Sequence, residues 1–390
     1  MNQRSLAEGD RIMLSEAKPT LAARVEDKFI CIIPCKKEEN KVKSRLKGVI
    51  MNYELNMVSV VILNYNGLKL MQKYLPTVIE NSGGAEVVVA DNGSTDGSVE
   101  WLRKEYPKLR LIVFNENYGF AEGYNQALKQ VDNEYYVLLN SDVRTPKGWL
   151  EPLVEYMERH TECAACQPKI RSEYESEKFE YAGAAGGFMD VYGYPFCRGR
   201  MMGNVEVDNG QYDSIQEIFW ATGACLLIRS KAYWDAGGLD GRFFAHQEEI
   251  DLCWRLKARG ASIVCVPQSI VYHVGGGSLG YESPFKTRLN FRNNALLLYK
   301  NLSADRYWWT YIFRLFLDWV AALQMLLEGK PKNAWAVVEA QIEFIKMHRD
   351  FSRDREYNLK ATKQKKPEGL LNFWLIWQVY FNKKKKFSDL

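Results

Sequence analysis

The chain has 390 residues, which is enough for one large domain with appendages or for two domains. Hydrophobic residues make up 47% of it, an ordinary globular share that excludes a wholly disordered chain. The formal net charge of +4 is too small to indicate a nucleic-acid-binding protein, and the basic charge is clustered near the C-terminus, at Lys383–Lys386.

The first 56 residues differ in character from the rest of the chain. They carry mixed charge with little periodicity, whereas a strongly patterned domain begins at Met57. We therefore expect a poorly patterned N-terminal extension over 1–56. A start assigned too far upstream would produce the same pattern, with Met51 or Met57 as the natural first residue. No secretory signal is visible, so we expect a cytoplasmic setting.

The cysteines fit that reducing setting. Cys163 and Cys166 have the spacing of a zinc-ligand pair, but no second pair accompanies them, so we expect no zinc site. Three further cysteines lie in apolar runs, as buried reduced thiols do: Cys225, Cys253 and Cys265.

Four strand-like runs of the patterned domain each end in polar or acidic residues. Helix-like stretches separate the runs, so they predict βαβ units in a parallel sheet. Ligands of open α/β sheets bind outside the carboxyl ends of the strands, so the four ends predict one binding rim. The runs are Val58–Leu63, ending at Asn64 and Asn66; Glu86–Ala90, ending at Asp91; Leu109–Phe114, ending at Asn117; and Tyr135–Leu139, ending at Asn140.

Beyond these runs the pattern changes twice. Residues 170–216 are rich in Gly, Tyr and charge without a clear period, and we expect a long irregular insertion on the acceptor side of a site. Helical, apolar segments lie further on at Asn290–Asn301 and Tyr307–Leu327. Arg314 and Asp318, four residues apart in the second, are expected to pair, and two central charges disfavour a membrane span. We expect an interfacial or core helix there.

The segment before the C-terminal lysines is also apolar. Phe373–Phe381 followed by Lys383–Lys386 is typical of an amphipathic segment that binds anionic lipid. A helix packed on the preceding domain is the alternative.

Six motifs in chain order carry a family resemblance: VSVVILNYNG, VVVADNGSTDGS, NENYGFAEGYNQA, LLNSDV, FWATGACLLIRSKAYWDAGGLDGRFFAHQEEIDLCWRLKARG and VYHVGGGS. Together they resemble family 2 glycosyltransferases, closest to the rhamnosyltransferase-like branch, over about Val58–Tyr299. The resemblance implies an α/β GT-A fold, a Rossmann-like and mainly parallel twisted sheet with helices on both faces. We expect this domain at 57–300 and a helical, membrane-associating appendage at 301–390.

Asp91 is the first expected nucleotide contact. Its carboxylate can accept the imide N–H of uracil or thymine, which cytosine lacks. The resemblance assigns Asp91 this role and adds Asn64, Asn66 and Asp96 to the pocket. The alternative is a helix N-cap at Asp91, and we expect Ser94 and Thr95 to be caps.

Asn117 and Gly119 precede a helix. Glycine lets backbone approach a ligand and a helix N-terminus attracts phosphate, so both are expected to contact the nucleotide-sugar. No G-x-G-x-x-G comes after the first strand, which disfavours a nicotinamide enzyme.

Asn140, Ser141 and Asp142 occupy the place of the family's D-x-D motif. By resemblance, Asp142 and His273 hold a divalent cation, Mg²⁺ or Mn²⁺, on the donor diphosphate, while Asn140 and Ser141 contact the nucleotide-sugar. An Asn in place of the first acid brings no charge, so weaker metal binding is expected. The alternatives are a turn aspartate at Asp142 and a core histidine at His273.

The family places a Glu-Asp pair, whose Asp is the catalytic base, where this chain has Glu248 and Glu249. We expect Glu249 to be the base, with Glu248 and Asp251 as alternates. Acids in a first helical turn also offset the helix dipole, and Asp251 can pair with Arg255, so a structural role is the competing interpretation. The acceptor side is expected at Trp220, Thr222 and Gly223.

These features predict an inverting, metal-dependent glycosyltransferase that moves a sugar, rhamnose by resemblance, from a UDP- or dTDP-sugar to a glycan or lipid-linked acceptor. It would act in surface polysaccharide or cell-envelope synthesis, in the cytoplasm or at the inner face of the cytoplasmic membrane. The alternatives are a non-catalytic nucleotide- or glycan-binding relative and a sugar-nucleotide pyrophosphorylase. The pyrophosphorylase loop after the first strand is replaced here by Asn64-Tyr65-Asn66-Gly67.

Overall fold

The computed structural model describes residues 24–25, 28–29, 55–275 and 283–390. The chain divides into two compact units, Met1–Val49 and Ile50–Leu390. In the first unit, β1 (Arg24–Val25) and β2 (Lys28–Phe29) pair antiparallel. The extension predicted over 1–56 lies almost entirely outside the described residues.

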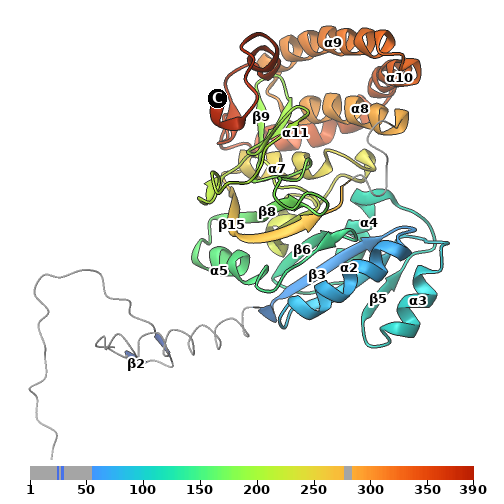
Figure 1. Ribbon diagram of the computed structural model, residues 1–390. Helices are drawn as coiled ribbons and strands as arrows, with labels where there is room; N and C mark the ends of the chain where they lie inside the picture. The colour runs from blue at the N-terminus through green and yellow to red at the C-terminus, as the bar shows by residue number, and fades with distance from the viewer. Residues whose placement is uncertain (1–23, 26–27, 30–54, 276–282) are drawn as a thin grey trace, which may run out of the picture. The chain divides into compact units, whose positions relative to one another are not determined.

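All four predicted strands are present and parallel, as expected. They are β3 (Val58–Asn64), β4 (Glu86–Asp91), β5 (Arg110–Val113) and β6 (Tyr135–Asn140), in the spatial order β6-β3-β4-β5. The central strands are buried on both faces, which is why their sequences read as continuous apolar runs rather than alternating ones. Helices cover both sides of the sheet (Figure 1): α2 (Leu68–Asn81), α3 (Ser98–Glu105) and α4 (Gly119–Leu128).

The sheet continues beyond β6 with mixed direction. Strand β14 (Cys225–Arg229) runs antiparallel between β6 and β8 (Cys163–Ser172), and β15 (Ser262–His273) pairs parallel with β8. Two short strands, β7 (Val143–Arg144) and β13 (Gln216–Glu217), pair with β15. The remaining elements here are α5 (Glu151–Arg159), α6 (Ser230–Asp235), η1 (Gly241–Phe243) and α7 (Glu248–Ala258).

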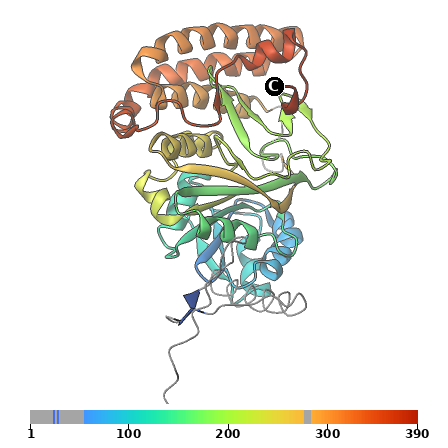
Figure 2. The same cartoon turned by 90° about the vertical axis from the view of Figure 1, so that its left-hand side faces the viewer.

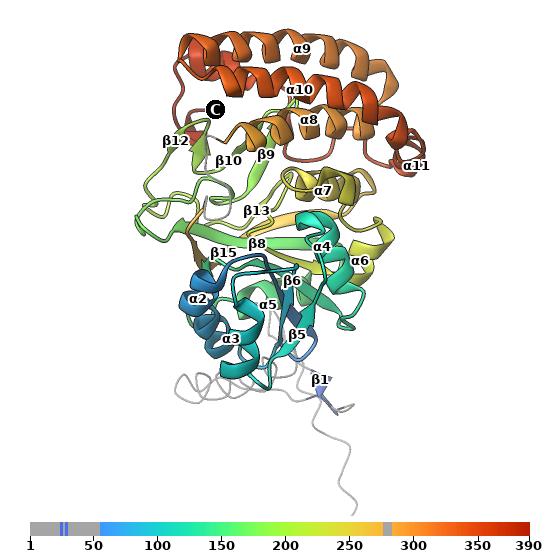
Figure 3. The same ribbon diagram turned by 90° about the vertical axis from the view of Figure 1, so that its right-hand side faces the viewer.

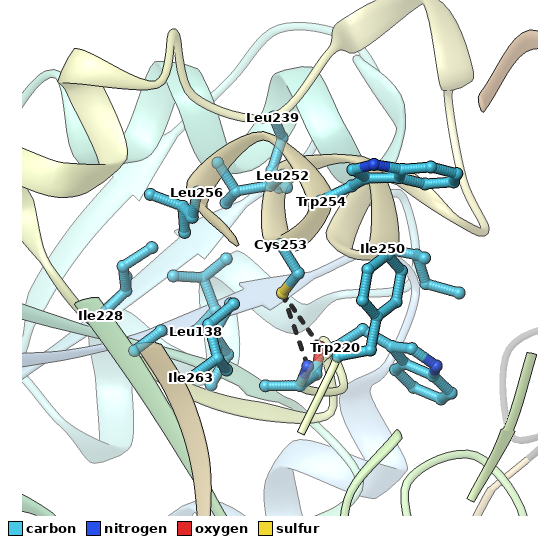
Figure 4. Packing of buried hydrophobic residues seen from close by; sticks show 14 of the residues in the cluster. Leu138, Trp220, Ile228, Leu239, Ile250, Leu252, Cys253, Trp254, Leu256 and Ile263 are labelled. Carbon is cyan, nitrogen blue, oxygen red and sulfur yellow. Dashed lines mark hydrogen bonds between the residues drawn. The ribbon is translucent and has the colours of Figure 1, made fainter. Parts of the chain in front are cut away.

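Helix α7 packs its apolar side onto this half of the sheet (Figure 4). Cys253 lies at the contact, with its sulfur 3.4 Å from the Ala221 backbone nitrogen. Six cysteines of the described chain are buried free thiols, including the three that the sequence predicted and the Cys163 and Cys166 pair.

The expectation of an irregular insertion at 170–216 is corrected in part. Most of the segment is turn or irregular, but it also contains four short strands of a second sheet, β9 (Gly187–Asp190), β10 (Pro195–Cys197), β11 (Arg200–Met201) and β12 (Asn204–Val205). Strand β16 (Leu370–Leu371) completes this sheet. Strands of two to four residues are too short to show a period in the sequence, and β16 comes from far along the chain.

Helices form the remainder of the second unit. They are α8 (Pro284–Asn301), α9 (Ala304–Leu327), α10 (Pro331–Met347), η2 (His348–Phe351), α11 (Ser352–Ala361), η3 (Trp377–Phe381) and η4 (Phe387–Asp389). Helix α10 packs against both α8 and α9, and α9 lies at the outer edge, farthest from the main sheet (Figures 1 and 2). The predicted Arg314–Asp318 ion pair is confirmed, with nitrogen and oxygen 3.4 Å apart.

Candidate active site

The strand register brings the first predicted residues together. Asn64 lies opposite Asp91 in the β3–β4 pair. The fully buried Asp91 carboxylate accepts hydrogen bonds from the Asn64 side-chain nitrogen at 2.8 Å and from the Ser94 backbone N–H at 2.9 Å. Asn64 Oδ1 is also buried and has no hydrogen-bond partner within the described chain. The rim therefore holds a fixed carboxylate beside an amide oxygen whose hydrogen-bonding capacity is unused within the described chain.

The loops after β3 and β4 are tied to each other. Asn66, at φ 49°, accepts a hydrogen bond from the Thr95 backbone N–H at 2.7 Å. Asp96 accepts from Leu68 N at 2.8 Å and from Ser98 N at 3.1 Å, so it joins the starts of α2 and α3. Both residues lie at the rim as predicted, with structural partners of their own.

Ser94 and Thr95 are not helix caps, contrary to the sequence prediction. Helix α3 begins at Ser98, after Gly97 in the left-handed region. The Ser94 hydroxyl instead accepts from the Asn66 backbone N–H at 2.9 Å. The helix starts later than the cap-forming residues suggest because a turn separates them from it.

Asn117 and Gly119 shape the start of α4. Asn117 Oδ1 accepts from the Gly119 N–H at 2.8 Å and from Asn92 Nδ2 at 3.0 Å. Gly119 has φ +76°, and a Cβ there would lie 2.5 Å from the Phe244 ring. Glycine is thus required by packing at this position. Nucleotide contact at this helix start stays a prediction.

Asp142 and His273 meet because β7 pairs with the end of β15. The register places Val143 opposite His273, and His273 Nε2 lies 3.1 Å from Asp142 Oδ1. On its other side, His273 Nδ1 lies 3.4 Å from Oε1 of the buried Glu180. Burial lowers the pKa of His273, but the two carboxylates outweigh it and raise the pKa to about 10.

This pair fits a hard divalent cation. Adjacent ligands of an octahedral cation at about 2.1 Å lie about 3 Å apart, close to the Asp142–His273 separation. Glu180 then stands where a carboxylate orients a metal-bound histidine, and Asn140 Nδ2 lies 3.4 Å from His273 Nε2, near enough to offer its amide oxygen after a flip. Across the described ranges no larger cluster of His, Cys, Asp and Glu could hold a metal, so remaining ligands would come from substrate and water.

Glu180 was missed in the sequence. It belongs to the 170–216 segment, 93 residues before His273, and no local spacing links the two. An acidic residue in a charged, unpatterned segment carries no sign that it will be buried. Only the pairing of β8 with β15, and the fold of the segment beside it, brings Glu180 to the histidine.

The acids of α7 have different environments. Asp251 is fully buried and accepts hydrogen bonds from Arg255 at 2.9 Å, Lys300 at 2.8 Å and Asn301 at 2.8 Å. Its pKa is lowered: burial opposes ionisation, but the Arg255 and Lys300 charges outweigh it. These contacts give Asp251 the structural role that its i,i+4 spacing suggested.

Glu248 and Glu249 instead have no cationic partner among their described contacts. One carboxylate oxygen of each is buried without a hydrogen-bond partner in the described chain. Burial raises the pKa of Glu249 to about 7, and burial together with the Glu249 charge raises the pKa of Glu248 well above its ordinary value. Glu249 can therefore exchange a proton near neutral pH.

The three residues predicted on the acceptor side have different environments. Trp220 is buried over Gly187 and donates to Phe188 O at 2.9 Å, so it has a packing role. Thr222 is buried as well, and its backbone N–H donates to Gln167 at 3.0 Å. Gly223 lies at the site: a Cβ there would come 3.1 Å from the Phe120 ring and 4.0 Å from Glu249 Cβ.

Known proteins are similar in sequence to this domain. Residues 59–235 match the model of Glycosyl transferase family 2. An N-acetylglucosaminyl-diphospho-decaprenol L-rhamnosyltransferase of Mycobacterium tuberculosis is 26% identical over 272 residues, which cover 65% of this chain and 87% of that protein. A low-salt glycan biosynthesis hexosyltransferase of Haloferax volcanii is 23% identical over 71% of this chain and 87% of its own length.

A solved structure is similar in fold. GalNAc-T7, in complex with UDP, GalNAc and Mn²⁺, superimposes with a TM-score of 0.53 at 13% identity, over 90% of this chain and 66% of that chain. The predicted α/β GT-A fold with C-terminal helices is thereby confirmed, and at this identity the likeness extends to the fold alone.

Proposed function

Because residues 59–235 match the model of Glycosyl transferase family 2, we propose that the chain moves a sugar from a UDP- or dTDP-sugar to an acceptor hydroxyl. The buried Asp91 carboxylate at the strand rim supports a base with an imide N–H. Rhamnose is proposed as the sugar from the similarity to the mycobacterial rhamnosyltransferase, and cell-envelope or surface glycan as the product.

Glu249 is the proposed base, and its environment is the observation that carries the proposal. It has a raised pKa, an unpaired carboxylate oxygen and a position beside Gly223. A base of this proton affinity can take the acceptor proton as the hydroxyl oxygen attacks the anomeric carbon. The C–O bond to the acceptor forms as the bond to the nucleotide diphosphate breaks, so one displacement inverts the configuration. Glu248 is the alternate.

Asp142 and His273 are proposed to hold a divalent cation, with Asn140 beside them and Glu180 orienting the imidazole. When bound, the cation would neutralise charge on the leaving diphosphate. His273 must be neutral to act as a ligand, so binding would displace the proton that Asp142 and Glu180 favour.

Thermal stabilisation by UDP, dTDP, GDP and CDP, with and without Mn²⁺, tests the donor and the cation. A ligand at one hundred times its dissociation constant adds about 2.7 kcal/mol to stability. Metal-dependent stabilisation by UDP or dTDP alone, lost in Asp142→Ala, is expected. Stabilisation by no diphosphate would overturn the nucleotide site.

Turnover separates the proposal from its alternatives. Release of many nucleotides per enzyme with an acceptor, abolished in Glu249→Gln, excludes a non-catalytic binding protein. Formation of nucleotide-sugar from nucleoside triphosphate and sugar phosphate would instead indicate a pyrophosphorylase.

The C-terminal helices support a lipid-linked acceptor. The central charged residues of helix α9 face the protein interior, whereas many of its apolar residues face outward. Arg314 and Asp318 are buried and paired. Gln341 of α10 donates to Asp318 at 3.0 Å, and Arg314 donates to Tyr192 O at 2.9 Å. Between Trp308 and Leu323 the exposed residues of α9 are apolar, and they form its outer face: Trp308, Trp309, Ile312, Phe316, Trp319, Val320 and Leu323. Within the described residues, α9 is also a helix long and apolar enough to cross a membrane. The buried ion pair favours contact with lipid from one side instead.

The C-terminal segment adjoins this outer face. Trp374 packs on Phe313 of α9, with ring centroids 5.1 Å apart, and Trp377 stacks on Phe381 at 4.2 Å. Exposed lysines come directly after, within Lys383–Lys386. Apolar surface beside basic residues is the pattern that binds anionic bilayers. We therefore propose that the protein is cytoplasmic and binds the inner face of the cytoplasmic membrane, where a lipid-linked acceptor resides.

Flotation with vesicles tests this contact. Phe316→Glu is expected to lower the fraction bound to phosphatidylglycerol vesicles about tenfold, since burying a Phe side chain is worth about 1.5–3 kcal/mol. Tyr357→Glu is the matched control, because Tyr357 is 61% exposed on α11. Unchanged flotation of Phe316→Glu, with a change in oligomeric state, would show that a second copy of the chain covers the face.

A further inference from the structure

The segment before Glu248 has an unusual backbone. Phe244, His246 and Gln247 have φ values of 66°, 71° and 71°, in the left-handed region that residues other than glycine rarely adopt. Such conformations are strained, so surrounding contacts must hold the segment in place. Helix α7 begins directly afterwards, and with it Glu248 and Glu249.

One side chain of α8 holds this segment. Asn293 is fully buried, and its Nδ2 lies 3.0 Å from Phe243 O, 2.8 Å from Ala245 O and 2.7 Å from His246 O. Its Oδ1 accepts from Arg292 Nε at 2.9 Å. Since Arg can only donate, the amide has one possible orientation, with its nitrogen toward the three carbonyls.

The neighbours of Asn293 hold the two ends of the same segment. Arg292 Nη2 donates to Phe243 O at 3.0 Å. Asn294 Nδ2 donates at 3.0 Å to the side-chain oxygen of Gln247, the residue that precedes α7. One turn of α8 therefore contacts the segment from beginning to end. Figure 3 shows α8 next to α7 in this arrangement.

The opposite side of the segment contacts the nucleotide side of the site. Phe244 O accepts from the Phe120 N–H at 2.7 Å, and the Phe244 ring packs where a Cβ of Gly119 would lie. A displaced segment would move the start of α7 relative to the start of α4. Such a movement changes where the proposed base lies without removing any group that contacts donor.

We propose that Asn293 is a positioning residue, which holds the left-handed segment from Phe244 to Gln247 so that Glu249 faces Gly223. The inference rests on the proposed function, because it assigns Asn293 to the base of that reaction. Asn293 lies 44 residues from Glu249 in the chain and acts through backbone carbonyls. It contacts none of the residues proposed to bind nucleotide or cation.

Asn293→Ala removes the donor and leaves three carbonyls without it. We expect kcat to fall 10- to 100-fold while the dissociation constant for UDP or dTDP, measured by calorimetry, stays within twofold of the wild-type value. Asn290→Ala is the matched control: Asn290 is on the same helix, its side chain donates to Lys286 O at 3.0 Å, and its link to the segment is by the backbone alone. This control is expected to keep kcat within twofold.

A pH profile of kcat distinguishes a displaced Glu249 from a general loss of stability in Asn293→Ala. In addition to burial, the charge of Glu249 raises the pKa values of Glu248 and Cys253 of α7 and of Cys197 of β10, so these are the titratable groups near it, and burial is the main cause of its own raised pKa. Asn293→Ala is expected to move the acidic limb of log kcat by at least one pH unit toward the ordinary glutamate range, because Glu249 leaves its buried place. Asn290→Ala should leave that limb in place.

Three results overturn the inference: kcat of Asn293→Ala within twofold of wild type, an unmoved acidic limb, or nucleotide affinity lost in proportion to kcat. If Asn293→Ala does not fold, Asn293→Ser, which adds no titratable group near Glu249, takes its place with the same expectations. Glu249→Gln distinguishes failure of the proposed base from failure of the positioning role. Full activity of Glu249→Gln would refute the proposed base itself, whereas an inactive Glu249→Gln with a normal Asn293→Ala refutes the positioning role alone.

Discussion

Two substitutions at neighbouring acids of α7 are expected to change stability in opposite directions. Asp251→Asn should lower the free energy of unfolding, because the Asp251 carboxylate is surrounded by Arg255, Lys300 and Asn301. Glu249→Gln should raise it, because Glu249 is held where its ionised form is disfavoured. The two acids are two residues apart in the same helical turn, so a difference between the two changes in unfolding free energy reflects their surroundings and not their position in the helix.

The magnitudes come from the contacts. Removing one partner from a buried ion pair costs about 3–5 kcal/mol. Lys300 retains Asp240 at 2.7 Å after Asp251→Asn, so the lower end, about 3 kcal/mol, is expected. For Glu249, the pKa rises from 4.5 to about 7. At about 1.4 kcal/mol for each pKa unit, ionisation costs the folded state about 3 kcal/mol, and about 2 kcal/mol after allowance for partial exposure of the side chain.

The two substitutions should also differ in how their effect on stability depends on pH. A raised carboxyl pKa destabilises the folded state fully above pH 7 and hardly at all below pH 4.5, so the gain from Glu249→Gln should be present in full at pH 8 and reduced to about a quarter at pH 5. The lowered pKa of Asp251 gives stability that persists above its ordinary value of 3.8. The loss in Asp251→Asn should therefore be similar at pH 8 and pH 5.

Urea denaturation of the full chain at both pH values measures these differences. A loss of stability in Glu249→Gln at pH 8 would refute the reasoning, since it would mean that the Glu249 carboxylate has a stabilising partner. An unchanged Asp251→Asn would likewise show that its ion pairs contribute nothing. Glutamine at 249 should also abolish transfer, so gain of stability with loss of activity is the expected combination.

Three further changes have definite expected outcomes. Gly119→Ala should destabilise the protein by more than 1 kcal/mol in urea denaturation, since φ is +76° and the new Cβ would lie 2.5 Å from the Phe244 ring; an unchanged midpoint would contradict that packing. Arg314→Met should cost about 3–5 kcal/mol by leaving Asp318 buried without its cation, unless α9 detaches, which exposure to limited proteolysis would reveal. Asp142→Ala should weaken Mn²⁺ binding in calorimetry at least tenfold while leaving metal-free nucleotide binding intact, and equal Mn²⁺ affinity would remove Asp142 from the cation site.

Much of the rim at the strand ends could be predicted from the sequence, because its signals are local. Apolar runs such as Val58–Leu63 are long enough to identify buried parallel strands, and the residue after each strand must then lie at the rim. The i,i+4 spacing of Asp251 and Arg255, and of Arg314 and Asp318, likewise predicted ion pairs that the structure contains. Helical geometry alone brings such residues together.

The tertiary structure decided the surroundings of the proposed base and cation. Glu180 reaches His273 only through strand pairing, and Asn293 reaches the Phe244–Gln247 segment only because α8 packs beside α7. The same packing separates the roles of three acids in the first turn of α7: Asp251 has cationic partners, whereas Glu248 and Glu249 have none among the described residues. A sequence shows which groups are present and which lie within a helical turn of each other. Burial and distant partners, which set the proton affinity of each group, exist only once the chain has folded.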